Sequence, residues 1–215
     1  MGKIVLATII ISGSAKWLLK VGGNKEKWYG SDRIFMYVMT VFGAMTVNYS
    51  EQCTEYGWVV SNLRLLAGCL LDGGLLSAAY MDRRNCWVYN YVWWWCLPWA
   101  GILGMTAGGE FSGIVAVLVF VMLQQLLFSR MYGKADCHAF SVCALAECGN
   151  AVGMVGFLLQ MFLSVVLLTI VQLFRGNVTP RGRLREPQPF IPYIITAFFS
   201  VMFLESVFRT TYIYA

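Results

Sequence analysis

The stretch FSGIVAVLVFVMLQQLLFS, residues 111–129, carries no charged side chain, and its few polar residues are serines and glutamines. A bilayer core is about 30 Å thick, so a helix that crosses it needs roughly 20 mostly apolar residues. The stretch therefore predicts a helix that lies in lipid, and the rest of the chain can be compared with it.

The whole chain shares this character. Of its 215 residues, 59% are hydrophobic and only 13% are charged. A soluble domain of this size could not cover so much apolar surface, because its exterior needs polar side chains. The apolar stretches are continuous, whereas strands of a membrane barrel alternate apolar and polar residues. The sequence predicts an all-α, polytopic membrane helical bundle.

We expect about eight transmembrane segments, within a range of six to eight. Two candidates are weaker than the rest: residues 4–19 carry Lys16, and residues 137–149 are short enough to form a tilted or partial helix. No stretch between segments is long enough to bury a core of its own. Residues 1–57 are interpreted as N-terminal helices with a short basic loop, and 58–215 as the membrane-embedded core. The clear candidates are residues 33–49, 58–80, 91–107, 111–129, 151–174 and 190–208.

The basic residues are distributed unevenly over the expected loops. With eight spans, 13 of the 16 Lys and Arg residues fall on one side of the membrane, which the positive-inside rule makes cytoplasmic. The net charge of +5 then reflects topology and predicts no nucleic-acid partner. The basic loop from Arg175 to Arg185 is interpreted as a topology signal or an anionic-lipid contact. The seven cysteines form no C-x-x-C pair and there is one histidine, so neither a metal site nor a disulfide framework is expected.

Two aspartates reach the predicted cytoplasmic boundary. Asp82 ends the stretch LLAGCLLDGGLLSAAYMD, and Asp136 follows Gly133, Lys134 and Ala135. An ionisable group at membrane depth is a functional hypothesis by default. Two carboxylates a few ångströms apart do not both ionise easily, and they can share a water, one as general base and the other as acid. The alternative is that each aspartate only caps a helix or lies in a solvated loop.

Three motifs over residues 60–208 together resemble the type IV prepilin peptidases. Asn90 follows Asp82 at the family's spacing of eight residues, and Gly101 takes the place of a helix glycine. The run Gly133-Lys134-Ala135-Asp136 is similar to the family's G-x-G-D. The stretch PFIPYIITAFF from Pro189 resembles the motif that opens the family's last helix.

The resemblance implies a membrane-embedded aspartyl endopeptidase of a bacterial or archaeal cytoplasmic membrane, with its active site facing the cytoplasm and no cofactor. Asp82 and Asp136 would be catalytic, and the partners would be a prepilin-like protein, which loses its short basic leader, and membrane lipids. Presenilin-type proteases share the G-x-G-D logic. The residues that would bind substrate or shape the site are Asn90, Gly133, Lys134, Ala135, His138, Pro189 and Pro192.

The sequence departs from the family pattern at several positions. The large cytoplasmic domain of longer members is reduced here to about residues 16–33, which leaves their second activity, N-methylation of the new N-terminus, open. The substituted positions are Tyr89 for proline, Ala135 for glycine, His138 for lysine and Ile191 for glycine.

Two other functions remain open: a small proton- or cation-coupled transporter that uses Asp72, Asp82 and Asp136, and a family member that only binds its partner. Asp72 lies about 15 Å along a helix from Asp82, so we expect it outside the site and bonded to a polar neighbour. Glu147 and Glu205 are expected to be interior hydrogen-bonding or boundary residues. Lys134 or His138 could favour the carboxylate form of Asp136.

Overall fold

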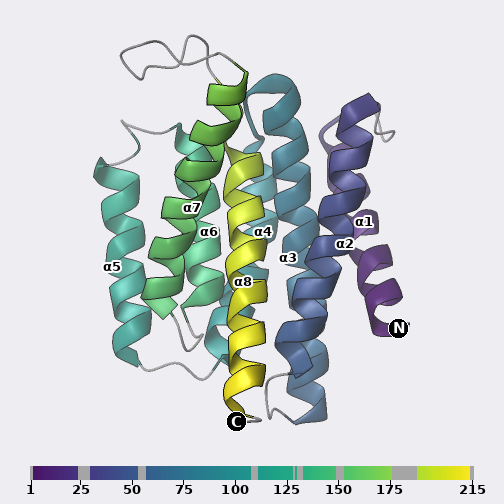
Figure 1. The fold of residues 1–215 in the computed structure, drawn as a ribbon, viewed down its shortest axis with the longest axis vertical. Helices are drawn as coiled ribbons and strands as arrows, with labels where there is room; N and C mark the ends of the chain where they lie inside the picture. The colour runs from purple at the N-terminus through teal and green to yellow at the C-terminus, as the bar shows by residue number, and fades with distance from the viewer. Residues whose placement is uncertain are drawn as a thin grey trace.

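The computed structural model describes residues 2–23, 30–52, 57–107, 111–127, 129, 133–148, 153–175 and 188–213 (Figure 1). These residues contain no strand, which confirms the all-α prediction. They form the helices α1 (Gly2–Val21), α2 (Gly30–Gln52), α3 (Trp58–Asn85), α4 (Asn90–Thr106), α5 (Phe111–Leu127), α6 (Lys134–Glu147), α7 (Gly153–Phe174) and α8 (Ile191–Ile213).

Four of these helices are long and apolar enough to cross a membrane. α5 is a shorter apolar helix, and the 14 residues of α6 cover only about 20 Å. The outward side chains of α7 are apolar, with Val155 and Phe162 both more than two-thirds exposed. Such a surface suits lipid and not water, so the structure fits a helical membrane protein. The four long helices are Gly2–Val21, Trp58–Asn85, Gly153–Phe174 and Ile191–Phe208.

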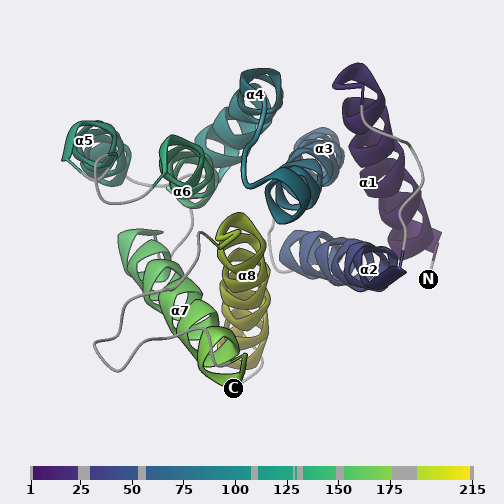
Figure 2. The ribbon, with the colours of Figure 1, turned by 90° about the horizontal axis from the view of Figure 1, so that it is seen from above.

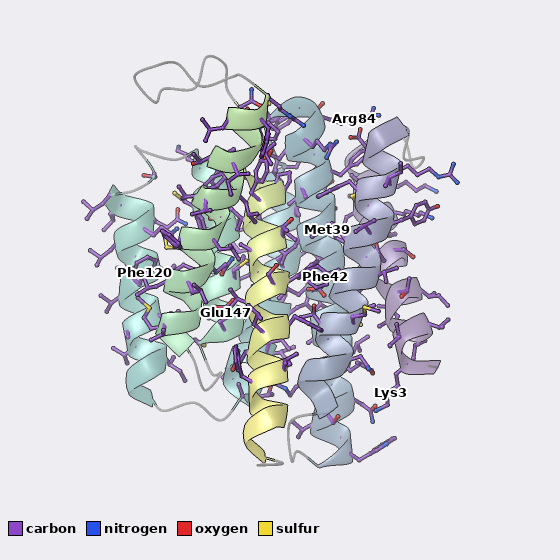
Figure 3. All side chains as sticks on the ribbon, in the orientation of Figure 1. Lys3, Met39, Phe42, Arg84, Phe120 and Glu147 are labelled. Atoms are coloured by element: carbon purple, nitrogen blue, oxygen red, sulfur yellow. The ribbon has the colours of Figure 1, made fainter. Side chains whose placement is uncertain are left out.

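Successive helices run in opposite directions (Figure 1). As a result α1, α3, α5 and α7 finish at the end of the bundle where α2, α4, α6 and α8 begin, and we call this the site end. Figure 3 shows Arg84 at this end and Lys3 at the other. The helix ends that flank the connections predicted to be basic therefore share one end of the bundle.

α3 lies in the middle of one half of the bundle and packs against α1, α2, α4 and α8 (Figure 2). Adjacent glycines explain how two neighbours approach so closely. A Cβ atom at Gly73 would collide with the Ser14 side chain of α1, and one at Gly74 with the Cys96 sulfur of α4. Small residues let membrane helices pack backbone to backbone, and this packing fixes the position of the end of α3.

The structure corrects two predicted boundaries. Asp82 does not end its helix, because α3 continues to Asn85 and stops at Cys86, whose φ of 53° is left-handed. The Cys86 N–H donates to the Asp82 carbonyl at 2.8 Å, which completes the last turn. The short segment expected over 137–149 begins three residues earlier, at Lys134, so that Asp136 lies inside its first turn.

Candidate functional site

Asp82 lies in the last turns of α3 and its side chain is buried, with 5% exposure. Its Oδ2 accepts a hydrogen bond from the backbone N–H of Ile191 at 2.9 Å, and the Phe190 backbone contributes a further hydrogen bond. The first N–H groups of a helix have no partner within the helix, so a carboxylate from outside satisfies them well. Asp82 therefore fixes the start of α8 against the end of α3.

Asp136 is the third residue of α6 and is partly buried. Its Oδ2 accepts the N–H of Gly133 at 3.2 Å, so the carboxylate folds back on the start of its own helix. A Cβ atom at position 133 would lie 3.2 Å from that same oxygen. Glycine at position 133 thus leaves the room that this contact needs.

Burial raises the pKa of Asp136 to about 6, and the hydrogen bond from Gly133 opposes that rise. The sequence suggested that Lys134 could act on the pKa of Asp136. In the structure, burial and, to a smaller extent, the charge of the exposed Lys134 lower the pKa of His138. Asp136 therefore keeps part of its protonated form close to neutral pH.

The structure brings Asp82 and Asp136 together at the site end. The two carboxylates come from α3 and α6, and they are near enough to interact electrostatically. α8 packs against both helices, and its first turn is the one that Asp82 binds. Two carboxylates that interact at one end of a bundle do not both ionise easily, so that one of them can act as a base and the other as an acid.

Asn90 and His138 line a cavity of about 320 Å³ between α4 and α6. Its walls are mostly aromatic and apolar, and they include Trp93, buried against the core, and Trp94, which is 75% exposed. The His138 ring lies 6.0 Å from the Trp93 ring. Trp93 therefore belongs to the packed core, whereas Trp94 faces outward.

Gln125 of α5 holds one wall of this cavity in place. Its Nε2 donates to Ser141 Oγ at 3.0 Å and lies 3.4 Å from His138 Nδ1. Both partners are on α6, as expected for a glutamine that bridges two membrane helices. His138 is therefore positioned from two sides, by Gln125 and by Trp93.

The remaining predicted site residues take different places. Pro189 and Pro192 flank the start of α8 and line a second cavity, of about 470 Å³, which also includes Arg83. Ala135 packs against the core next to Asp136. Lys134 is exposed.

Sequence reasoning missed two contributors to the site end. Ile191 was noted only as a departure from the family pattern, yet its backbone N–H is the donor to Asp82. Asp32 of α2 pairs with the Nε atoms of Arg83 at 2.7 Å and Arg84 at 3.2 Å. We call this pairing of Asp32 with the two arginines the clamp, and its only sequence signal is an aspartate just before the apolar run of α2. A backbone donor such as the Ile191 N–H leaves no local pattern in the sequence, and neither does a contact between helices.

Asp72 lies apart from this site, as predicted, but without the polar partner that was expected. Its side chain is 3% exposed, and Oδ2 has no hydrogen-bond partner among the described residues. Asp72 lines a cavity of about 30 Å³ together with Arg64 and Phe199, which is room for about one water. Both carboxylate oxygens of the buried Glu147 likewise find no partner in the described part of the chain.

No family model, curated protein or solved structure matches this chain. Within the described residues, no group of three or more His, Cys, Asp or Glu side chains is arranged to hold a metal ion. Two carboxylates, the starts of α6 and α8 that they bind, and two cavities share the site end.

Proposed function

We propose that this chain is a membrane-embedded aspartyl endopeptidase of the prepilin peptidase type. It removes the short basic leader from a prepilin-like substrate at the cytoplasmic face of the membrane. Asp82 and Asp136 activate the attacking water. The observation that carries the proposal is that these two carboxylates, one buried and one partly buried, come from separate helices and lie near each other at one end of the bundle.

The chemistry needs one carboxylate and one carboxylic acid. The ionised aspartate takes a proton from water while the oxygen of that water attacks the peptide carbonyl carbon. The protonated aspartate donates its proton to the leaving amine as the C–N bond breaks. A pKa of about 6 for Asp136 suits such sharing, because both protonation states are populated close to neutral pH.

The cavity between α4 and α6 gives the substrate a place to lie. Its lining residue His138 is two positions beyond Asp136 on α6. The exposed Trp94 and Leu97 on the other wall suit an apolar helix that arrives from the bilayer. Asn90 and Ser141 supply polar groups to a stretch of substrate backbone that unwinds before cleavage.

We further propose that all eight helices lie in the membrane, α6 only partly, with the site end in the cytoplasm. Seven basic residues lie within or directly after the parts of α1, α2, α3, α6 and α7 next to the site end, whereas Lys3 lies at the opposite end. The positive-inside rule then orients the bundle. The other predicted basic loop residues, Lys25, Lys27, Arg130, Arg181, Arg183 and Arg185, lie outside the described residues.

Co-expression with a prepilin tests the proposal. Wild-type protein is expected to shorten the prepilin by its leader, and Asp82→Asn and Asp136→Asn are each expected to abolish this cleavage. Asp72→Asn is the matched control, because it removes a buried carboxylate from the same helix as Asp82 but apart from the pair. Cleavage that survives either pair substitution in a correctly inserted protein would refute the mechanism.

A transporter is the second candidate, favoured by one observation: the buried Asp72 and Glu147 have carboxylate oxygens without partners in the described structure. Intramembrane carboxylates of this kind often mark ion pathways. The cavity beside Asp72 holds only about one water and therefore provides no path by itself. Asp72→Asn separates the two functions, because it should leave cleavage intact if the chain is a protease and block ion flux into proteoliposomes if it is a transporter.

A further inference from the structure

The 470 Å³ cavity at the site end is larger than the one between α4 and α6, and the proposed hydrolysis does not use it. It opens between α2, α3, α7 and α8. Arg83, Arg175 and Gln188 supply its polar groups, and Phe35, Val171 and Tyr193 supply most of its apolar wall. A cavity that is basic on one part and apolar on another suits an amphiphile with an anionic group.

The charge of the lining is positive. Two of the residues that line it are arginines, and none of the described lining residues is acidic. Arg83 and Arg84 both pair with the single carboxylate of Asp32. Arg175 adds another positive charge from the end of α7.

One of the arginines, Arg83, and the amide of Gln188 are also held in place. The Arg83 guanidinium carbon lies 5.1 Å from the centre of the Phe35 ring, and its Nε is 2.7 Å from Asp32. Gln172 donates to the Gln188 side chain at 3.2 Å, which fixes Gln188 against α7. A guanidinium that is already oriented loses little freedom when it binds a phosphate group, and arginine matches phosphate geometry well.

We infer that this cavity binds the phosphodiester headgroup of an anionic phospholipid, whose acyl chains lie along Phe35 and Val171. Basic pockets between membrane helices bind anionic headgroups in this way. The apolar wall favours a lipid over a free phosphate, which would gain nothing from it. A basic leader peptide would be repelled by the arginines. The inference concerns binding alone and does not depend on the protease proposal.

Native mass spectrometry of the purified full chain in a neutral detergent tests this inference. The probes are dioleoyl phosphatidylglycerol, dioleoyl phosphatidylcholine and glycerol 1-phosphate. We expect one phosphatidylglycerol to bind at least about tenfold more tightly than phosphatidylcholine, and glycerol 1-phosphate to bind far more weakly. Equal binding of the two lipids would overturn the inference, and tight binding of glycerol 1-phosphate would replace the lipid with a free phosphate ester.

Two variants locate the site. Arg175→Gln should weaken phosphatidylglycerol binding about five- to tenfold, and Val171→Trp should block it by filling the cavity without changing the charge. Lys3→Gln is the matched control, because it removes one positive charge at the opposite end (Figure 3) and should leave binding unchanged. Circular dichroism checks that each variant is folded. Unchanged binding in folded Arg175→Gln and Val171→Trp proteins would place the lipid elsewhere and overturn the inference.

Discussion

Asp82 and Asp136 each have a structural role beside the proposed chemical one. Asp82 binds the start of α8, and Asp136 binds the start of α6. The structure therefore agrees with the alternative that each aspartate caps the start of a helix. Capping does not exclude catalysis, because the two caps come from different helices and lie near enough to each other to interact electrostatically.

The pKa of Asp136 predicts how stability depends on pH. Because folding raises this pKa from an ordinary value near 4 to about 6, the folded protein holds the proton more tightly than the unfolded chain does. The contribution to stability is complete below pH 4 and is lost as the pH rises through 6. It amounts to on the order of 2 to 3 kcal/mol.

Thermal unfolding of wild type and Asp136→Asn between pH 4 and pH 8 measures this effect. The asparagine does not titrate, so the stability of wild type relative to the variant should fall as the pH rises. A difference that stays constant across this range would show that Asp136 is not held in its protonated form by burial. The titrating groups other than Asp82, which interacts with Asp136, are common to both proteins and cancel in the comparison.

At the scale of elements, the start of α8 depends on a side chain from α3. Asp82→Ala removes the acceptor of the Ile191 N–H and leaves that donor buried, which we expect to cost about 1–3 kcal/mol. Asp82→Asn keeps an oxygen in the same place and removes the repulsion from Asp136. The asparagine variant should therefore unfold at a temperature close to that of wild type, and the alanine variant several degrees lower. Equal losses in both variants would contradict this role for the carboxylate oxygen.

The helices followed from the sequence because their apolar runs are long and their loops are polar. The predicted segment 58–80 and the observed α3 begin at the same residue and differ in where they end, at residue 80 and at Asn85. No glycine or proline follows Asp82 to mark the stop, and the helix ends instead at a left-handed Cys86. Residue preferences place such an ending poorly, because cysteine seldom adopts this conformation.

The site was predictable only in part. The motif spacing and the basic loops placed Asp82, Asn90, Asp136 and Pro189 at one end of the bundle. The donor from Ile191 was not predictable, since every residue other than proline carries a backbone N–H and only the fold selects one. The clamp of Asp32 on Arg83 was not predictable for the same reason, because it joins the start of α2 to the end of α3 and only the fold brings these two places together.

At the scale of the whole molecule, the proposed orientation predicts which thiol is reachable from which side. Cys86 is exposed at the site end, and five other described cysteines are buried. In a Cys53→Ser background, a membrane-impermeant maleimide should label Cys86 in inside-out vesicles and not in intact spheroplasts. A Cys86→Ser variant gives the background signal. Labelling in intact spheroplasts would reverse the orientation and place the aspartates on the outer face.

The most direct test of the central claim is the rate at which purified, reconstituted protein cleaves a prepilin peptide that carries a basic leader. If Asp82 and Asp136 act on one water, Asp82→Asn and Asp136→Asn should each lower kcat/KM by at least about a thousandfold. The double variant should then be hardly worse than either single variant, because groups that work as a unit are lost together. Failure of wild type to cleave, or a loss below about tenfold in either single variant, would contradict the account.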